Sequence, residues 1–361
     1  MAKPLSHPLH GYENSTIVSL KRGDSIDLTR RDVLRYAGRA AIGLVVGSIV
    51  GMRVRPSSAA AASKATVAYL RAGYTCEGTL FAAQAQGYFR DEGLDLTAVA
   101  LSSGPEAAAE MMKGNIDAMQ DPAWTLMSPL LPKGMNVGDM VATAGLQRGS
   151  MSIVVAADSP IRSLSGLRGL KVSAGDRWRF MFGQPLAAAG LNPKNDIDWQ
   201  PALPPPKVAE AIKTGQVAAA MVHQPYAAAI ESSGVGRILI AQNTPPMQND
   251  YCCSVIIPAE LVRSDRKKAA AITRALMRGS AWIQAHVSDS AQLLIDLKHV
   301  STSLADNQRA MAALDFSPSV EVTRQNTLNI LRRFKRLGFF DPATDEGSLL
   351  ERIFVPVTGE L

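Results

Sequence analysis

Apolar stretches alternate with amphipathic ones from residue 65 onward, at lengths typical of strands and helices. The segment 94–101, LDLTAVAL, alternates apolar and polar positions as a half-buried strand does, and 105–114, PEAAAEMMKG, has the proline start and glycine end of a helix. Between 258 and 286 the pattern predicts one long helix. The alternating β/α order is typical of mostly parallel sheets flanked by helices. We expect further strands at 65–73, 115–120, 151–158, 197–202, 216–222, 237–242 and 252–258.

Two halves of the chain repeat one phrase. GNIDAMQDPAW begins at Gly114 and GQVAAAMVHQPYA at Gly215, and each runs from glycine through a strand to a proline and an aromatic residue. The repetition predicts two open α/β sheets that face each other. In such sheets ligands bind at the carboxyl ends of the strands, so we expect the functional site in the loops that follow them.

The amino-terminal segment has the order of an export signal. Arg30 and Arg31 precede an uncharged apolar run at 40–52, which is 13 residues long and therefore shorter than the roughly 20 residues of a membrane-spanning helix. Small residues that follow it predict cleavage near Ala61–Ser63. Residues 1–62 would then be a signal peptide, and the mature chain would be periplasmic. A buried or amphipathic amino-terminal helix is the alternative.

The motif TRRDVLR at 29–35 resembles the twin-arginine signal, in which Ser or Thr and two arginines precede apolar residues. The resemblance implies the twin-arginine (Tat) export machinery as a partner. The segment 32–34 departs from that signal, which usually has an aromatic residue at its second position.

The positive charge of the chain is concentrated in this leader. The whole chain has a formal net charge of +6, whereas residues 1–62 hold nine Lys and Arg against four Asp and Glu. The remainder is therefore nearly neutral, with 29 basic and 28 acidic residues. Nucleic-acid binding needs a basic face, so we expect no nucleic-acid partner.

The chain resembles the periplasmic substrate-binding proteins of ABC importers, in the branch that binds nitrate, alkanesulfonates, taurine and thiamine precursors and shares its fold with thiamine-pyrimidine synthases. The phrases that carry the resemblance are AQAQGYFRDEGLDL at 83–96, SSGPEAAAEMMKGNIDA at 102–118, SPIRSLSGLRGLKVSAG at 159–175 and GQVAAAMVHQP at 215–225. The resemblance implies an α/β, two-lobed periplasmic-binding-protein type II fold with a two-segment hinge. It also implies capture of a small polar molecule between the lobes and delivery to the permease of an ABC importer.

We expect residues 63–150 and 245–361 to form lobe 1 with the carboxyl-terminal helices, and residues 151–244 to form lobe 2. The two crossovers would lie near 145–150 and 241–250. The second of these segments holds two prolines and several polar residues, which indicates an irregular structure. Closure about such a hinge needs no catalytic residue.

Five loops after strand ends supply the candidate ligand contacts. They hold Tyr74, Thr75, Cys76 and Glu77; Ser103 and Gly104; Asp121 and Trp124; Asp176, Arg177 and Trp178; and Gln224 and Tyr226. The tryptophans of the third and fourth loops would hold a flat ligand between them, or else pack in the core. Ser103 would bond the ligand or cap the next helix. Arg177 would pair with an anion or remain solvated.

The charges of these loops bear on the ligand. Glu77, Asp121 and Asp176 would repel a desolvated anion, so they favour an amine, an aminopyrimidine or a zwitterion. A sulfonate-like ligand is the alternative that the resemblance implies.

The three cysteines leave another function open. Cys252 and Cys253 are adjacent, and Cys76 is distant in sequence. A thiamine-pyrimidine-synthase-like enzyme would use the pair, but two cysteines with no neighbouring histidine are too few for a metal site. Alternation along a strand would let only one of them face a pocket, so we interpret them as structural.

No cofactor, metal or catalytic residue is expected. The sequence has no Walker-type phosphate loop, no G-x-S-x-G and no H-E-x-x-H. A ligand-sensing protein without a transport role remains a further alternative.

Overall fold

A computed structural model describes residues 62–127, 130–175 and 178–361, without the side chain of Trp178. The predicted signal peptide therefore lies almost entirely outside the described residues, as do the candidate ligand contacts Asp176 and Arg177. Within the described part, no helix combines the length and apolar character needed to span a membrane.

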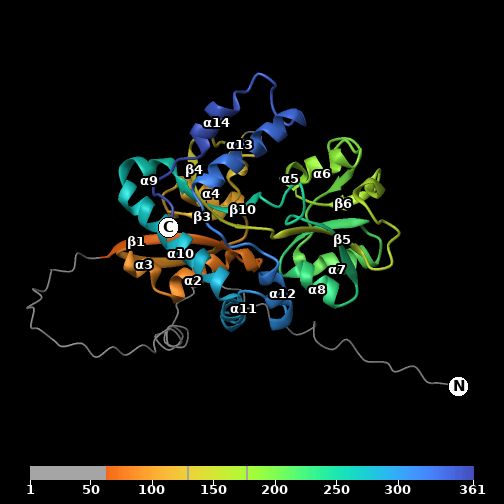
Figure 1. Cartoon of the computed structure of the whole chain (residues 1–361), viewed down its shortest axis with the longest axis horizontal. Helices are drawn as coiled ribbons and strands as arrows, with labels where there is room; N and C mark the ends of the chain where they lie inside the picture. Colours follow the sequence, from red (N-terminus) through yellow and green to blue (C-terminus); the bar gives the residue numbers. More distant parts are fainter. Residues whose placement is uncertain (1–61, 128–129, 176–177) are drawn as a thin grey trace, which may run out of the picture.

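The chain forms two lobes, with the amino- and carboxyl-terminal parts in lobe 1 and the middle of the chain in lobe 2 (Figure 1). In lobe 1, β1 pairs with β2 in parallel, while β10 lies between β3 and β4 and is antiparallel to both. A parallel bridge between Val67 and Ala118 joins the two sheets. The bounds are β1 Ser63–Leu70, β2 Leu94–Leu101, β3 Met119–Asp121, β4 Met140–Arg148 and β10 Tyr251–Pro258.

Lobe 2 is built on one five-stranded sheet in the order β7-β6-β8-β5-β9. Its apolar face is covered by α7 (Pro205–Lys213) and α8 (Tyr226–Ser232), whose Ile212 and Ile230 pack with Val154 and Val222 of the sheet. The strands are β5 Met151–Ala156, β6 Lys171–Ser173, β7 Asp198–Gln200, β8 Ala219–His223 and β9 Gly236–Ala241. Three shorter helical elements belong to this lobe: η3 Leu164–Leu167, α5 Trp178–Met181 and α6 Gly183–Ala188.

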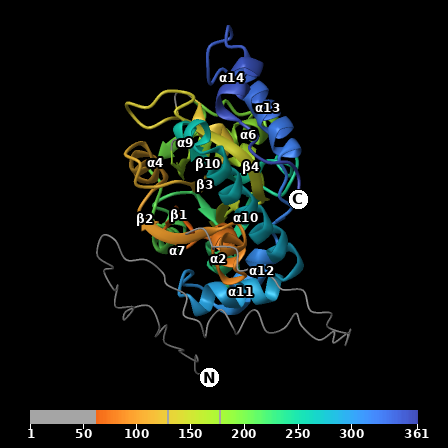
Figure 2. The same cartoon turned by 90° about the vertical axis from the view of Figure 1, so that its left-hand side faces the viewer.

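Helices cover the sheets of lobe 1, and α10 (Arg266–Ala285) runs across them against α2 (Gly78–Ala85) (Figure 2). The two helices approach closely at Gly279, where a Cβ would lie 2.4 Å from the carbonyl oxygen of Thr79. The other helical elements are η1 Thr75–Glu77, α3 Tyr88–Asp91, α4 Gly104–Met112, η2 Ala123–Leu126, α9 Ala259–Ser264, α11 Val287–Asp296, α12 Leu304–Ala312, α13 Glu321–Arg336 and α14 Glu346–Ile353.

The predicted fold class is confirmed, but the strands are less parallel than expected. Among the strand pairs of the described chain, four are antiparallel and three are parallel. The antiparallel pairs involve β5 and β10, each of which pairs with a strand on both of its sides. Each of these two strands follows a crossover between the lobes, because the chain enters lobe 2 between β4 and β5 and returns to lobe 1 between β9 and β10.

Several elements differ from the sequence prediction. The long helix expected at 258–286 is broken into α9 and α10 at Asp265, whose carboxylate accepts a hydrogen bond of 2.9 Å from the backbone N–H of Lys268 and so caps α10. Strand β4 and helix α8 were not expected. The sequence of β4, MVATAGLQR, lacks clear alternation because almost every residue is buried.

The carboxyl-terminal helices contact both lobes. Phe334 of α13 packs edge-on against Trp124 of lobe 1, with ring centroids 5.7 Å apart, and against Phe180 of lobe 2 at 5.6 Å. Phe339, just after α13, lies 4.2 Å from the Phe180 ring. The segment assigned to lobe 1 on sequence grounds thus also packs on lobe 2.

A buried ion pair holds the returning crossover on α13. Arg333 contacts the carboxylate of Asp250, which is 2% exposed, and Asn326 donates a 3.1 Å hydrogen bond to the same carboxylate. Burial raises the pKa of Asp250, while Arg333 opposes that rise. The pair therefore compensates a charge that has no access to water.

We expect Arg333→Ala to lower the free energy of unfolding by about 3 kcal/mol, because it leaves a buried carboxylate without its partner. Chemical denaturation at neutral pH measures the loss. Arg332→Ala is the matched control, since Arg332 is exposed on the same helix. Equal stability of the two variants would contradict the assignment.

Candidate ligand-binding site

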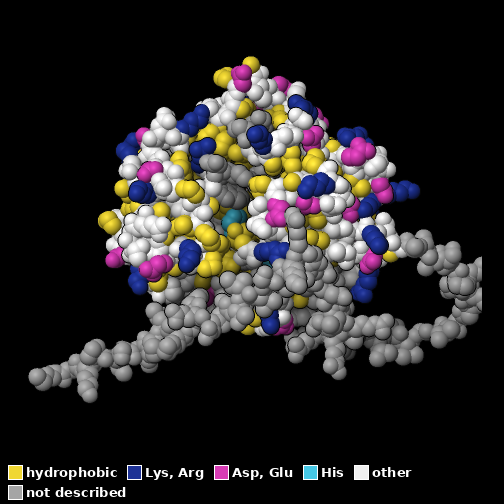
Figure 3. Space-filling view, turned by 180° about the vertical axis from the view of Figure 1, so that it is seen from behind, with side chains coloured by type: hydrophobic (Ala, Val, Ile, Leu, Met, Phe, Trp, Pro, Cys, Tyr) yellow, Lys and Arg dark blue, Asp and Glu magenta, His cyan; other side chains and the backbone are white. Residues whose placement is uncertain are grey.

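A cavity of about 240 Å³ lies where the two lobes face each other. Figure 3 shows the hollow between them, with hydrophobic side chains along its edges. Lobe 1 contributes the ends of β1 and β3, η1, the loop after β2 and the start of β10, and lobe 2 contributes the end of β8 and the segment before α7. The polar and thiol side chains of the wall are Tyr69, Tyr74, Cys76, Glu77, Ser102, Ser103, Gln120, Asp121, His223, Cys252 and Cys253.

Glu77 is fixed at the end of β1. Its Oε1 accepts a hydrogen bond of 2.5 Å from the backbone N–H of Leu70, which folds the loop back onto the strand that precedes it. Its Oε2 makes no hydrogen bond and lies 3.4 Å from His299 Nε2, a nitrogen that is also 3.2 Å from the carbonyl oxygen of Tyr74. This oxygen is buried beside the imidazole and has no hydrogen-bond partner in the described chain.

The electrostatics of Glu77 follow from its burial. The residue is 4% exposed, and burial raises the pKa of its carboxyl, while the imidazole of His299 opposes the rise. Burial likewise raises the pKa of Tyr74, so its hydroxyl remains a neutral donor. The wall therefore offers two hydrogen-bonding groups, the Glu77 carboxyl group and the Tyr74 hydroxyl, whose neutral forms are favoured by burial.

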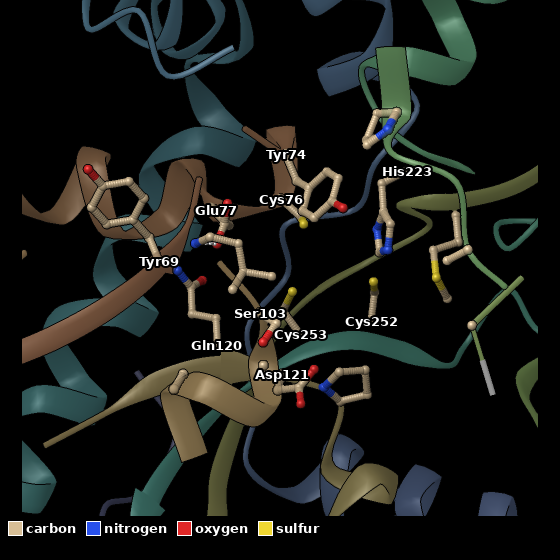
Figure 4. A pocket seen from close by; sticks show the side chains of 18 of the residues that line it. Tyr69, Tyr74, Cys76, Glu77, Ser103, Gln120, Asp121, His223, Cys252 and Cys253 are labelled. Carbon is tan, nitrogen blue, oxygen red and sulfur yellow. Dashed lines mark hydrogen bonds between the residues drawn. The ribbon is translucent and has the colours of Figure 1, made fainter. Parts of the chain in front are cut away.

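The lobes touch beside the cavity. The ring of Tyr74 stacks on His223 of lobe 2, with centroids 4.3 Å apart and planes at 29°. The backbone N–H of Thr75 donates a 3.0 Å hydrogen bond to the carbonyl oxygen of Gln224, and the hydroxyl of Tyr226 donates to Ala72. Figure 4 shows Tyr74 and His223 side by side above the cysteines. These contacts describe a closed arrangement of the lobes.

Both Cys252 and Cys253 line the cavity, together with Cys76. The expectation that only one of the adjacent pair would face it is wrong, because β10 is irregular here. Tyr251 lies opposite Arg148 and Cys253 opposite Gln147, so Cys252 is the extra residue of a bulge. A bulge interrupts the alternation of side chains and turns both thiols to one side.

The structure brings six of the predicted contacts together at the cavity wall: Tyr74, Cys76, Glu77, Ser103, Gly104 and Asp121. Ser103 also fulfils the alternative interpretation, because its hydroxyl accepts a 3.2 Å hydrogen bond from the backbone N–H of Glu106 and caps α4. The Asp121 carboxylate accepts a 3.1 Å hydrogen bond from the hydroxyl of Thr125.

Four predicted contacts lie outside the cavity wall. Trp124 is 1% exposed and packs on Phe334, because η2 turns it toward α13, so its placement against a ligand is corrected to the core. The hydroxyl of Thr75 donates to Asn307 at 3.0 Å. Gln224 accepts a hydrogen bond from Ala228 of α8, and the Tyr226 hydroxyl is engaged by the interlobe bond described above. The side chain of Trp178 lies outside the described part, so the proposed aromatic sandwich loses one member.

Sequence reasoning missed Gln120. Neither its amide oxygen nor its amide nitrogen has a hydrogen-bond partner, and both are buried at the wall. A glutamine in the short strand MQD was the signal that could have identified it. A buried amide group usually has hydrogen-bond partners, so one at a strand end beside the cavity is a candidate ligand contact. Gln120 therefore offers a ligand both a donor and an acceptor.

Among the described residues of the wall, acidic side chains outnumber lysines and arginines. Glu77 and Asp121 line the cavity, and within the described residues no lysine or arginine does. Nor does the described chain hold a group of three or more His, Cys, Asp or Glu side chains arranged for a metal ion.

Residues 58–296 match the model of the NMT1-like family. The chain belongs to the NMT1-like family. No curated protein matches the chain significantly. Solved structures share the fold of this NMT1-like protein, including the nitrate-binding protein NrtA of Synechocystis PCC 6803, at 16% identity and a TM-score of 0.66, over 81% of this chain and 86% of that one.

Two further structures are similar. The aliphatic sulphonate-binding protein SsuA of Escherichia coli has 16% identity and a TM-score of 0.62, over 83% of this chain and 94% of its own. A ligand-binding component of an ABC-type import system from Staphylococcus aureus, with zinc bound, has 15% identity and a TM-score of 0.64, over 81% of this chain and 97% of its own. At these identities the likeness establishes the two-lobed type II fold.

We expect Glu77→Gln to change how stability depends on pH. Because the folded state raises the pKa of Glu77, folding holds its proton more tightly, and the wild type loses this contribution as pH rises from about 4 through the folded-state pKa. The glutamine cannot ionise, so the stability of the variant relative to wild type should increase from pH 4 to pH 7.

Chemical denaturation at several pH values measures this difference. Glu210→Gln, on the exposed side of α7, is the control. A difference between Glu77→Gln and wild type that stays constant with pH would contradict the assigned burial of the charge.

Proposed function

We propose that this protein is an extracytoplasmic solute-binding protein that captures a small polar molecule between its lobes and delivers it to the permease of an ABC importer. One observation carries the proposal: the cavity is walled by strand ends from both lobes, and the lobes touch beside it through Tyr74 and His223. A ligand held there would favour the closed arrangement, which is the hinge mechanism of two-lobed binding proteins.

The similar structures support the transport role. They are a periplasmic nitrate-binding protein, a periplasmic aliphatic sulphonate-binding protein and a ligand-binding component of an ABC-type import system. No step of chemistry is needed for such a function. The leader at 1–62 supports export, and we infer removal near Ala61–Ser63 after passage through the twin-arginine route.

We further infer that the ligand is neutral or cationic and bears nitrogen. An anion bound beside Glu77 and Asp121 would be repelled at short range in a site where water is excluded. An amine or aminopyrimidine would instead donate hydrogen bonds to Asp121 and to Glu77 Oε2, while Gln120 would accept and donate at the same wall. The described lining offers an anion no lysine or arginine side chain.

Titration calorimetry with 4-aminopyrimidine, putrescine, taurine, ethanesulfonate and nitrate tests this inference. We expect binding of one of the two nitrogen bases and none of nitrate or ethanesulfonate. Asp121→Asn should weaken the binding about tenfold to a hundredfold, because it removes a charge-assisted hydrogen bond. Asp158→Asn, an exposed position of lobe 2, is the control and should leave the affinity unchanged. Tight binding of nitrate or ethanesulfonate would overturn the ligand class but not the binding function.

The export route has its own test. Replacing Arg30 and Arg31 together with lysine should retain the full-length protein in the cytoplasm, because the twin-arginine route reads the arginine pair. Arg22→Lys, outside the motif, is the control. The mass of the protein in the extracytoplasmic fraction reports the result, and an exported wild-type protein that still begins at Met1 would contradict cleavage.

A further inference from the structure

Three thiols meet at the wall of the cavity. Cys76 comes from η1, and Cys252 and Cys253 come from the start of β10. Figure 4 shows their sulfur atoms facing the same part of the cavity. All three are free, and they are 3%, 1% and 5% exposed, so reagents reach them only by way of the cavity. Solute binding as proposed above does not use them.

We propose that Cys76 and Cys252 form a dithiol site that undergoes thiol–disulfide exchange with small disulfides entering the cavity. This inference is independent of the transport role, because it needs only the cavity and the three thiols. It identifies a covalent modification site at the wall that the solute would occupy.

Cys252 is the attacking group. The neighbouring side chains of Cys253 and Cys76 lower the pKa of Cys252, and burial opposes that effect. The same interaction raises the pKa of Cys253. The thiolate is the nucleophile in disulfide exchange, so the bulged Cys252 reacts before its neighbour.

Cys76 is the resolving group, because geometry disfavours Cys253. Every cis peptide bond of the described chain precedes a proline, so the bond between Cys252 and Cys253 is trans. Their Cα atoms are then about 3.8 Å apart, shorter than the roughly 4.4 Å minimum of ordinary disulfides. Cys76 belongs to η1, so the distance between its Cα atom and that of Cys252 is not fixed by a shared peptide bond.

The exchange balances in two steps. The Cys252 thiolate attacks one sulfur of a disulfide RSSR, forms a mixed disulfide and releases RS⁻, which takes up a proton. The Cys76 thiol loses its proton and attacks the Cys252 sulfur, forming the Cys76–Cys252 disulfide and releasing the second RSH. The protein dithiol is oxidised by two electrons, and RSSR is reduced to two thiols.

The test uses the neutral reagent 2-hydroxyethyl disulfide on the reduced, folded protein, with intact mass and peptide mapping as readouts. We expect the wild type to lose two hydrogen atoms, retain no reagent and yield a tryptic peptide of 72–90 linked to one of 238–263. Since Cys252 and Cys253 share the second peptide, fragmentation between them must place the link on Cys252.

The variants separate the roles of the thiols. Cys76→Ser should stop at a mixed disulfide on Cys252, and Cys252→Ser should react at least about tenfold more slowly, because it removes the thiolate that attacks the disulfide. Cys253→Ser removes the adjacent thiol, and it should still form the link between Cys76 and Cys252. Circular dichroism verifies that each variant is folded.

Three results would overturn the proposal: an unmodified wild-type protein, a link or adduct at Cys253, or a folded Cys252→Ser variant that reacts as fast as wild type. The wild-type mapping decides the case even where a variant does not fold. None of these results bears on the solute titrations, so the two proposals fail separately.

Discussion

The buried strand β10 is the element on which the fold and the cavity both depend. Each of its residues is buried, and its two neighbours, β3 and β4, pair with it along opposite edges. It receives the chain returning from lobe 2, so any shift of its register would move the lobes and the cavity together. Its pairing also places Asp121 opposite Ser254, which sets that carboxylate at the wall. One strand thus links the hinge, the sheet and the site.

The second constraint is electrostatic. A cavity that closes over Glu77 and Asp121 removes water from two carboxyl groups, and such desolvation is costly unless a partner compensates it. Away from the cavity, Asp250 has Arg333 for this purpose. At the wall, Glu77 has an imidazole at 3.4 Å and keeps one oxygen without a hydrogen bond. The Asp250 carboxylate is thus paired within the protein, as expected of a structural residue. The Glu77 carboxyl group has an oxygen to which a ligand could donate a hydrogen bond.

The sequence predicted elements wherever local signals and tertiary packing agree. Strand β2 has its predicted bounds because alternation matches its half-buried position, and α4 begins at the residue after its Ser103 cap. Strand β4 escaped prediction because burial on both faces removes alternation. The positions of the strand ends predicted which loops reach the cavity. They did not predict which side chains of those loops point into it. Trp124 and Cys252 show why: a short 3₁₀ turn and a bulge each redirect a side chain through contacts distant in sequence.

One of the thiols and the Glu77 carboxyl group belong to the same short element, η1, and this ties redox chemistry to solute binding. Cys76 and Glu77 are consecutive in η1, and Tyr74 just before them forms the contact with lobe 2. Cys76, Cys252 and Glu77 line the same cavity, so a solute that fills it would stand between the thiols and an entering disulfide. Occupancy by a solute would then protect the dithiol, and oxidation would reduce the capacity of the cavity for its solute.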